Sequence, residues 1–328
     1  MIKISDKILN KPEKKSMRDG FGDALLELGR RNPKVVGLCA DLTESVKMEA
    51  FAKKYPTRYF QCGVAEQNMV AVAAGLALAG KIPFASTFGV FFMRTVDQIR
   101  ISVCYNQANV KLAASHGGIT VGADGATHQA LEDLGTMRGL PNMTVVCPAD
   151  YWQTYKATLA IAAKKGPCYL RFGRGEVPMI TSKNTLFQLG KAQILQDGTD
   201  VTVVACGIMV YEALKAADAL KNKVSVQVIN CHTLKPLDKA SLLKAARKTK
   251  AVVTAEEYQV YNGLGSAVAE VLSQNYLVPI EMVGIHDTFG ESGKPEELMK
   301  KYHLTANDIV LAIKKVLKRK HECSPNSH

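Results

Sequence analysis

The amino-acid sequence predicts an α/β protein built from two doubly wound domains, each a mostly parallel sheet with helices on both faces. Strand-like apolar runs alternate with helical patterns along most of the 328 residues, and 47% of the side chains are hydrophobic. The alternation breaks once, over residues 175–190, and then restarts. A chain of this length supports two cores of ordinary size. We expect a first domain at residues 1–178, a linker at 179–190, a second domain at 191–320 and a tail at 321–328.

The elements of the first domain follow from their apolar patterns. Helices are expected over residues 17–31, 62–80, 92–106, 130–139 and 150–165. Strands are expected at the short apolar runs between them, at 34–42, 82–88, 110–115, 143–149 and 168–173. Residues 116–129, "HGGITVGADGATHQ", are rich in glycine and polar side chains and are expected to form a loop.

The second domain repeats the alternation without repeating the sequence. Strands are expected at residues 201–206, 224–230, 251–256 and 279–285. Helices are expected at 209–222, 238–249, 263–275 and 306–320.

The charge balance excludes some classes of protein. The formal net charge is +12, but Lys and Arg are spread along the chain without a basic stripe, so nucleic-acid binding is not expected. A small anionic substrate suits the excess of cations equally well. The chain contains neither an apolar run of 18 residues nor a signal-like start, so no membrane association is expected.

The eight cysteines show no CxxC or Cys/His spacing, which argues against a zinc site and a disulfide framework. Most lie in strand-like apolar runs and are expected to be buried free thiols. This usage is typical of a reducing compartment, and we predict a cytoplasmic protein.

Glu66 is the only charged residue in the run "CGVAEQNMVAVAAGLALAG", residues 62–80. The run is too long for one strand and predicts a buried helix entered through Gly63. A carboxylate among apolar neighbours is costly unless it is paired or protonated. Glu66 is therefore expected to have a partner or a raised pKa.

Polar residues that follow predicted strands are candidates for a ligand site, because ligands of doubly wound sheets bind at the carboxyl ends of the strands. The loop 116–129 offers His116, Asp124, Thr127 and His128 there. Any one histidine in a loop is more often structural than functional, but two histidines flanking an aspartate in one glycine-rich loop favour hydroxyl and phosphate recognition.

Three other stretches carry a weaker signal. Phe88 and Phe91 in "STFGVFF" are more often core residues than a platform for a flat ring. The "GLGS" at 263–266 opens a helix and could hold an anion there. The paired acids of "AEEY", 255–258, could serve an interface as readily as a site.

These residues together resemble the carboxyl-terminal half of transketolases. The motifs that carry the resemblance are "GVAEQNM", "STFGVFF", "GADGATHQALEDLGTMRGLPNMTVVCPAD" and "AEEYQVYNGLGSAVAE", in this order and spacing. It covers most of the chain, from about Arg18 to residue 293. It implies that the first domain is a thiamine-diphosphate pyrimidine-binding domain and the second a transketolase C-terminal domain.

The resemblance implies a role for Glu66 in binding thiamine diphosphate. Its carboxyl group would share a proton with N1′ of the aminopyrimidine, so that the 4′-nitrogen can take the proton from C2 of the thiazolium. This implies a ring nitrogen, rather than a protein cation, as the partner of Glu66. Phe88 and Phe91 would wall and stack on the pyrimidine, and Asp41 would lie near the cofactor. Arg94, counted with these residues as cofactor-binding, stands where a tyrosine is common in this pocket.

The resemblance also implies the substrate residues. Asp124 and His128 would contact hydroxyls of the donor sugar, and His128 is counted with Glu66 as catalytic. Arg18, Ser45, His116 and Arg174 would hold the phosphate end of the sugar, a task for which the guanidinium fork is suited. Tyr258 replaces a histidine of many relatives and is expected to affect the second domain rather than the chemistry.

The chain lacks the "GDG" and asparagine stretch that binds magnesium and diphosphate in this family. We therefore expect no metal site in this chain. Mg²⁺ (or Ca²⁺) would be held mainly by a partner subunit that carries the pyrophosphate-binding domain. The resemblance implies a split transketolase, a heterotetramer in which this chain also pairs with itself. A fragment of a longer enzyme is the alternative, although the charged N-terminus favours a natural start.

The expected activity is transfer of a two-carbon ketol unit between phosphorylated sugars. Alternatives within the same cofactor chemistry are a deoxyxylulose-phosphate synthase and the beta subunit of a 2-oxo acid dehydrogenase. A non-catalytic relative is a third possibility, and Arg94 is its main support. A Rossmann-type nucleotide-binding protein has only isolated glycine clusters in its favour.

Overall fold

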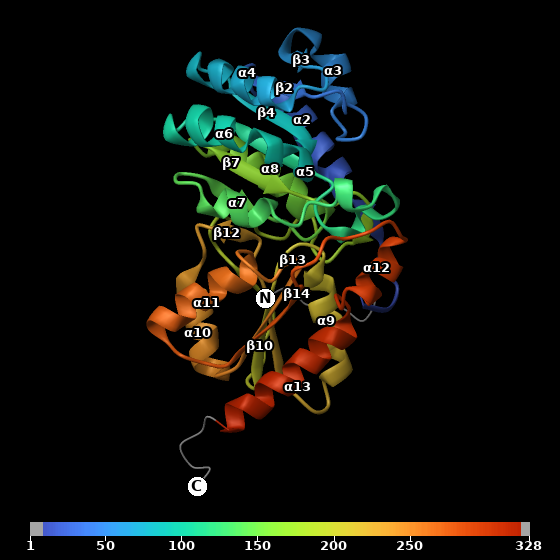
Figure 1. Cartoon of the computed structure of the whole chain (residues 1–328), viewed down its shortest axis with the longest axis vertical. Coiled ribbons are helices and arrows are strands. Elements are labelled where there is room, and N and C mark those ends of the chain that lie inside the picture. Colours follow the sequence, from blue (N-terminus) through green and yellow to red (C-terminus); the bar gives the residue numbers. More distant parts are fainter. Residues whose placement is uncertain (1–8, 323–328) are drawn as a thin grey trace.

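A computed structural model describes residues 9–322 of the chain. Two α/β lobes are stacked along the long axis of the molecule, the first domain at one end and the second at the other (Figure 1). The predicted fold class is confirmed. Cys323 and most of the predicted tail lie outside the described residues.

The first lobe is a seven-stranded sheet in the order β12-β6-β7-β5-β4-β2-β3. All its neighbouring strands are parallel except β12, which is antiparallel to β6. The first-domain strands are β2 (Val35–Cys39), β3 (Tyr59–Gln61), β4 (Ile82–Phe88), β5 (Lys111–Ser115), β6 (Thr144–Val146) and β7 (Cys168–Arg171). The longer helices are α2 (Met17–Arg31), α3 (Glu49–Lys54), α4 (Glu66–Leu78), α7 (Asp133–Gly139) and α8 (Tyr151–Ala163).

Several predicted elements of this lobe differ in detail. The helix expected over 92–106 is broken into α5 (Gly89–Phe92), η2 (Met93–Thr95), α6 (Val96–Gln98) and the π-helix η3 (Ile99–Tyr105). The loop 116–129 contains two 3-10 turns, η4 (Ile119–Asp124) and η5 (Ala126–His128). The short η1 (Pro56–Arg58), α3 and β3 were not predicted, because segments of three to six residues carry too little periodicity.

The expectation that residues 62–80 form a buried helix is wrong in one respect. The helix α4 runs from Glu66 to Leu78, and only its inner face is buried, through residues such as Met69 and Ala73. Its outer face exposes Val72 and Leu78 to solvent, the latter by 68%. Because α4 is apolar on both faces, its sequence does not show which face the same chain covers and which face it leaves exposed.

The second lobe is a five-stranded sheet in the order β14-β13-β10-β11-β9. Its strands are β9 (Gln193–Gln196), β10 (Val201–Ala205), β11 (Val226–Asn230), β13 (Val252–Gln259) and β14 (Ile280–Ile285). Only β9 is antiparallel to its neighbour. The helices are α9 (Met209–Leu220), α10 (Lys239–Thr249), α11 (Leu264–Asn275), α12 (Pro295–Lys301) and α13 (Ala306–Glu322). The short β9 and α12 were not predicted.

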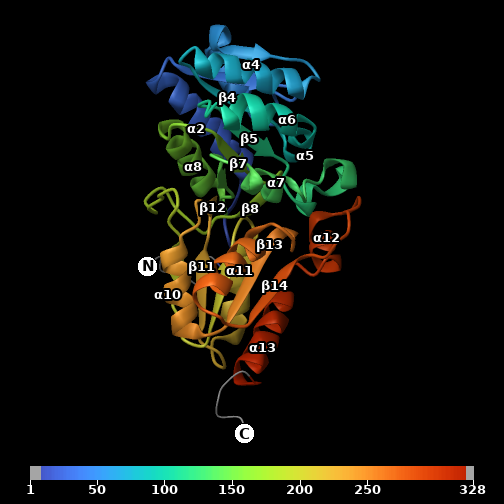
Figure 2. The same ribbon diagram turned by 60° about the vertical axis from the view of Figure 1, so that its left-hand side comes forward.

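Two strand pairs tie distant parts of the chain together. The strand β12 (Thr233–Lys235) leaves the second domain and extends the sheet of the first. The strand β1 (Lys14–Ser16) pairs with β8 (Glu176–Pro178), at the start of the segment read as a break in the alternation. The lobes therefore share backbone hydrogen bonds as well as side-chain contacts, and Figure 2 shows β12 directly below the first lobe.

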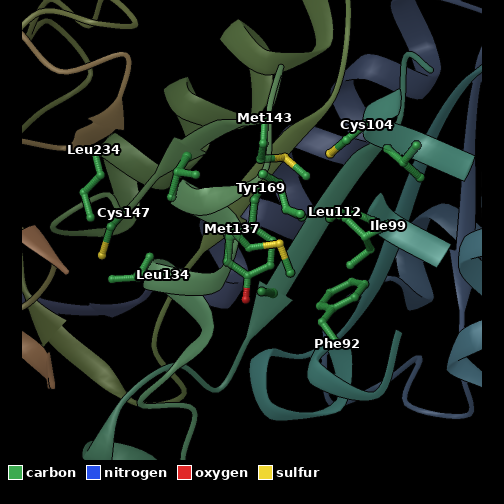
Figure 3. Packing of buried hydrophobic residues seen from close by; sticks show 14 of the residues in the cluster. Phe92, Ile99, Cys104, Leu112, Leu134, Met137, Met143, Cys147, Tyr169 and Leu234 are labelled. Carbon is green, nitrogen blue, oxygen red and sulfur yellow. The ribbon is translucent and has the colours of Figure 1, made fainter. Parts of the chain in front are cut away.

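One apolar cluster crosses from the first domain to the second. It contains Phe92, Met137 and Tyr169 of the first domain, and Leu234 beside Cys147 at the junction (Figure 3). Buried apolar area of this kind resists separation of the lobes. The relative placement of residues on the two lobes is therefore part of one packed core.

Within residues 9–322, the seven cysteines are free thiols, and six of them are buried. The same residues include no helix with the length and apolar character that crossing a bilayer requires.

Lys111, at the start of β5, is a buried amine without a carboxylate partner. Its Nζ donates to Asn109 Oδ1 at 2.8 Å and to the carbonyl oxygens of Lys164 and Gly166, each at 2.7 Å. Burial lowers the pKa of Lys111 to about 8. The side chain joins β5 to the turn between α8 and β7, at the edge of the sheet opposite the candidate site.

We predict that this lysine makes stability depend on pH. Between pH 8 and 10.5 the unfolded chain binds the Lys111 proton and the folded chain does not, so the free energy of unfolding should rise with pH. The full rise is about 3 kcal/mol. Urea unfolding of the wild type and of Lys111→Met between pH 7.5 and 10.5 checks this. The free energy of unfolding of the wild type minus that of Lys111→Met should increase with pH. A difference that stays constant over this range would contradict the prediction.

Candidate active site

The candidate residues gather at one edge of the first sheet, where its parallel strands end. Arg174 follows β7, His116 follows β5, and Phe88 ends β4. Asp41 and Ser45 follow β2, and Glu66 opens α4 just after β3. Because parallel strands end at a common edge, residues far apart in sequence converge here.

Aromatic rings form a short stack at the centre of this edge. The ring of Phe88 lies between His116, with ring centroids 3.6 Å apart, and Phe91, with centroids 5.3 Å apart and planes tilted by 15°. Phe88 is 6% exposed, so both of its faces are used inside the protein. The rings of His128 and Phe91 make a T-shaped contact, with ring centroids 5.4 Å apart. Phe91, which is only partly buried, is the better placed of the two phenylalanines to face a ligand.

Glu66 lies beside this stack and has a protein partner. Its side chain is 3% exposed, and its Oε2 accepts a hydrogen bond from Arg94 Nη1 at 3.2 Å. The Arg94 guanidinium carbon also lies 5.1 Å from the centroid of the Phe91 ring. The interpretation that no protein cation pairs with Glu66 is therefore wrong for this chain by itself. Burying the carboxylate without a counter-charge would cost several kcal/mol, and Arg94 offsets that cost.

Two arginines, Arg18 and Arg174, lie near His116. Arg18 Nη1 donates to the backbone carbonyl of Ser45 at 2.9 Å, while its buried Nε has no partner among the described residues. Arg174 Nη1 pairs with Asp124 Oδ1 at 3.3 Å and donates to Val121 O at 2.9 Å. Repulsion from Arg174 adds to burial in lowering the pKa of Arg18. An unpaired buried donor beside a second cation is a setting that favours an anion.

His116 joins the two groups. Its Nδ1 is hydrogen-bonded to Ser115 Oγ at 2.8 Å, and its ring stacks on the ring of Phe88. Burial lowers the pKa of His116 to about 3, helped by the positive charges of Arg18 and Arg174. The imidazole is therefore neutral near pH 7 and acts as a hydrogen-bonding group rather than as a cation.

Asp41 is placed at the same edge, although within residues 9–322 no hydrogen bond or ion pair links it to the other candidates. Its amide donates to Gln61 Oε1 at 2.7 Å, which ties the end of β2 to the end of β3. Asp41 adopts a φ of 59°, a conformation that aspartate tolerates better than most residues. Its carboxylate remains exposed.

The second domain supports the loop that carries His116 and Asp124. Glu257 Oε1 accepts from the amide of Thr120 at 2.6 Å, and Gln129 Nε2 donates to Glu291 O at 2.9 Å. The helix α12 packs against η4 of the same loop (Figures 1 and 2). The "AEEY" stretch is thus part of the interface between the domains.

Two expectations about the second domain need correction. Tyr258 does not act within that domain alone, because its hydroxyl accepts from the amide of Gly135 in the first domain at 2.8 Å. The N-terminus of α11 at "GLGS" is occupied by a group of the protein itself, the carboxyl group of Glu256. Its oxygens accept from Leu264 N at 2.6 Å and Gly265 N at 2.7 Å. These two donors are already used inside the protein.

Sequence reasoning missed the buried network beneath the site. Arg171, at the end of β7, donates to the carbonyl oxygens of Ala130 and Glu257 at 3.2 and 2.9 Å and lies 3.7 Å from Asp133. Tyr169 donates to Asp133 at 2.8 Å. A charged residue within a strand-like apolar run, as in "CYLRFG", is the signal that could have identified Arg171.

Family models match both lobes. "Transketolase, pyrimidine binding domain" matches residues 13–179, and "Transketolase, C-terminal domain" matches residues 190–309. The chain belongs to the transketolase family.

Relatives of matching length are parts of transketolases. A putative transketolase C-terminal section of Methanocaldococcus jannaschii is 44% identical over 93% of this chain and 97% of its own length. A 6-deoxy-6-sulfo-D-fructose transketolase subunit of Clostridium sp. is 46% identical over 94% of this chain and 97% of its own. The transketolase of Mus musculus is 38% identical over 95% of this chain, which spans only 49% of the mouse enzyme.

Solved structures agree with this transketolase assignment. A structure described as a split gene transketolase, inactive beta4 tetramer, has a TM-score of 0.88 and 50% identity. The alignment covers 93% of this chain and 99% of that one. The transketolase of Leishmania mexicana, with a TM-score of 0.78 and 25% identity, covers 96% of this chain with 48% of its own length.

We predict that His116 of this transketolase chain stays neutral far into the acid range. The unfolded chain binds its proton below pH 6.5, whereas the folded chain does so only near pH 3. His116 should therefore remove about 1.4 kcal/mol of stability for each pH unit that the solution falls below 6.5. Histidine ring resonances in an NMR titration check this, with His116→Gln identifying the signal. A His116 signal that titrates between pH 6 and 7 would show that the ring is accessible to protons.

Proposed function

We propose that this chain is the catalytic-glutamate subunit of a thiamine-diphosphate-dependent transketolase, which transfers a two-carbon ketol unit between phosphorylated sugars. The observation that carries the proposal is Glu66. Its buried carboxylate pairs with Arg94, whose guanidinium lies over the partly buried Phe91 ring, at the carboxyl edge of a parallel sheet. A carboxyl group placed next to an aromatic face can share a proton with a flat nitrogen-containing ring stacked on that face.

The chemistry of these groups fits the pyrimidine half of thiamine diphosphate. Glu66 supplies a carboxylate acceptor and Phe91 supplies a stacking surface. The diphosphate half needs a bound metal ion, and residues 9–322 include no group of three His, Cys, Asp or Glu side chains that could hold one. We infer that Mg²⁺ or Ca²⁺ and the diphosphate are held mainly by an N-terminal transketolase subunit with a pyrophosphate-binding domain.

When bound, thiamine diphosphate supplies a nucleophilic ring carbon and an electron sink. In this proposal Glu66 would hold and exchange a proton at a pyrimidine nitrogen, and Phe91 would orient the ring. Phe88, whose two faces are already covered, holds Phe91 and His116 in place. Asp41, which follows the end of β2, would bind close to the cofactor. These side chains orient the cofactor and exclude water from the carboxylate.

The same edge offers groups for the sugar. His128, whose ring makes a T-shaped contact with Phe91, and Asp124 bind hydroxyls near the reacting carbonyl, with His128 acting beside Glu66 as a catalytic residue. Arg18, Arg174 and His116, with the loop at Ser45, bind the anionic end of the sugar. The Arg174–Asp124 pair connects the hydroxyl subsite to the anion subsite.

The exposed apolar face of α4 and η3 supports the proposed assembly. Val72 and Leu78 on α4, and Ile101 and Tyr105 on η3, are 36%, 68%, 43% and 80% exposed. The two elements pack side by side, so these side chains belong to one region of the surface. Apolar surface of this kind favours burial against another subunit. We propose a heterotetramer in which two copies of this chain and two of the N-terminal subunit associate.

A sulfonated sugar is a second candidate substrate. One relative of matching length is named a 6-deoxy-6-sulfo-D-fructose transketolase subunit. A sulfonate, like a phosphate, presents anionic oxygens to arginine. The cationic group of Arg18 and Arg174 suits both ends, whereas an unsubstituted sugar would leave the buried Arg18 Nε without a charged partner.

The role of Glu66 is tested in the complex reconstituted from both subunits with thiamine diphosphate and Mg²⁺. We expect Glu66→Gln to lower ketol transfer by about two to four orders of magnitude, because the amide cannot exchange the proton. Glu49→Gln, an exposed acid in α3, is the matched control and should keep wild-type activity. Full ketol transfer by Glu66→Gln would refute the assignment.

The anion subsite is tested with a panel of sugars. Arg174→Met should raise KM for ketose phosphates by about ten- to a hundredfold and change the KM of an unsubstituted ketose little, because a charge-assisted pair is lost only with the anionic substrate. Comparing fructose 6-phosphate with 6-deoxy-6-sulfo-fructose identifies the preferred end group. Equal losses with charged and uncharged sugars would place Arg174 outside the anion subsite. Activity with pyruvate as the donor would instead favour a synthase or dehydrogenase subunit.

A further inference from the structure

Arg94 occupies the slot in which the proposed function needs the pyrimidine ring. One end of the slot is the Glu66 carboxylate, 3.2 Å from Arg94 Nη1. One wall is the face of Phe91, whose centroid is 5.1 Å from the guanidinium carbon. Phe91 also stacks on Phe88, with ring centroids 5.3 Å apart and nearly parallel planes. The guanidinium thus lies over the ring that the proposed function needs as a stacking surface.

A guanidinium and an aminopyrimidine present similar features to such a slot. Both are planar, both offer N–H donors to a carboxylate, and both stack on an aromatic face. Glu66 and Phe91 therefore make with Arg94 the two contacts that they would make with the cofactor ring. Both occupants cannot use the same carboxylate oxygen and the same ring face at once.

The backbone of Arg94 is fixed while its side chain is free to leave. Gln67 Nε2 donates to Arg94 O at 3.1 Å, and Thr95 Oγ1 donates to Phe92 O at 2.8 Å within the same turn. The Arg94 side chain is 54% exposed, in contrast to the 3% exposure of Glu66. Rotation of the Arg94 side chain into solvent would break its pair with Glu66 and would move no other buried group.

We propose that Arg94 is a built-in placeholder for the aminopyrimidine, which pairs with Glu66 in the unloaded chain and must swing out before thiamine diphosphate binds. This inference rests on the proposed function. The placeholder keeps the buried carboxylate compensated before the cofactor and partner arrive. Its cost is competition, because the cofactor binds only the fraction of molecules in which Arg94 has left the slot.

The direct test is cofactor affinity rather than turnover. In the reconstituted two-subunit complex with Mg²⁺, the Kd of thiamine diphosphate is measured by calorimetry for the wild type, Arg94→Gln and Arg94→Lys. Arg94→Gln should bind about three- to tenfold more tightly, because the competent fraction rises. Arg94→Lys retains the charge without the planar fork and should fall between the two. Arg31→Gln, an exposed arginine at the end of α2, is the control for loss of charge and should match the wild type.

A small cation provides a second readout. Methylguanidinium should compete with thiamine diphosphate in Arg94→Ala more strongly than in the wild type, since the vacated slot accepts the free guanidinium. Absence of this difference would contradict the placeholder. Unchanged or weaker cofactor binding by Arg94→Gln would overturn it and leave Arg94 as a group that holds the cofactor.

The outcomes separate this inference from the proposed function. Ketol transfer by the wild-type complex, together with unchanged affinity in Arg94→Gln, would retain the function and refute the placeholder. Cofactor binding by Arg94→Gln alone, with none by the wild type, would support the placeholder in its strongest form. Binding by neither protein would refute both.

Discussion

The site is organised around one buried carboxylate that requires a partner of opposite charge. Glu66 is almost fully buried at the first turn of α4, where the helix dipole favours a negative charge but does not replace a partner. Arg94 supplies that partner in the single chain, and the Phe91 ring holds the guanidinium in place. The stack that continues through Phe88 to His116 gives Phe91 its orientation. Glu66 follows β3, Phe88, Phe91 and Arg94 lie at or just after the end of β4, and His116 follows β5, so their convergence depends on the register of the parallel sheet.

The second domain contributes to this geometry through contacts rather than through ligands of its own. Glu257 fixes the loop that carries Asp124 and His128, and Tyr258 holds the start of α7. The strand β12 adds backbone hydrogen bonds across the junction. A loop rich in glycine loses much conformational entropy on ordering, and contacts from a second domain offset that loss. The pair of domains is therefore the unit that holds the loop of the proposed hydroxyl and anion subsites in place.

The same physical reasoning explains why the site points to a second kind of subunit. The ring side of the slot is provided by Glu66 and Phe91, whereas the described residues offer no comparable set of acids for a magnesium–diphosphate group. On α4 the buried face packs on β4, and the outer face carries apolar side chains that a single chain leaves in water. The helix that positions the carboxylate thus also carries apolar side chains that association with another subunit would bury.

The amino-acid sequence by itself determined the alternation of strands and helices, the two-domain order, the family, and the set of residues that reach one sheet edge. Periodicity and motif spacing are local properties, and they survive without knowledge of contacts. Only the tertiary structure decided how those residues are paired. It assigned Arg94 to Glu66, covered both faces of Phe88, gave the anion site at α11 to Glu256, and carried β12 across to the other lobe. Pairing depends on distances between segments that are far apart in the chain, and a one-dimensional pattern does not contain those distances.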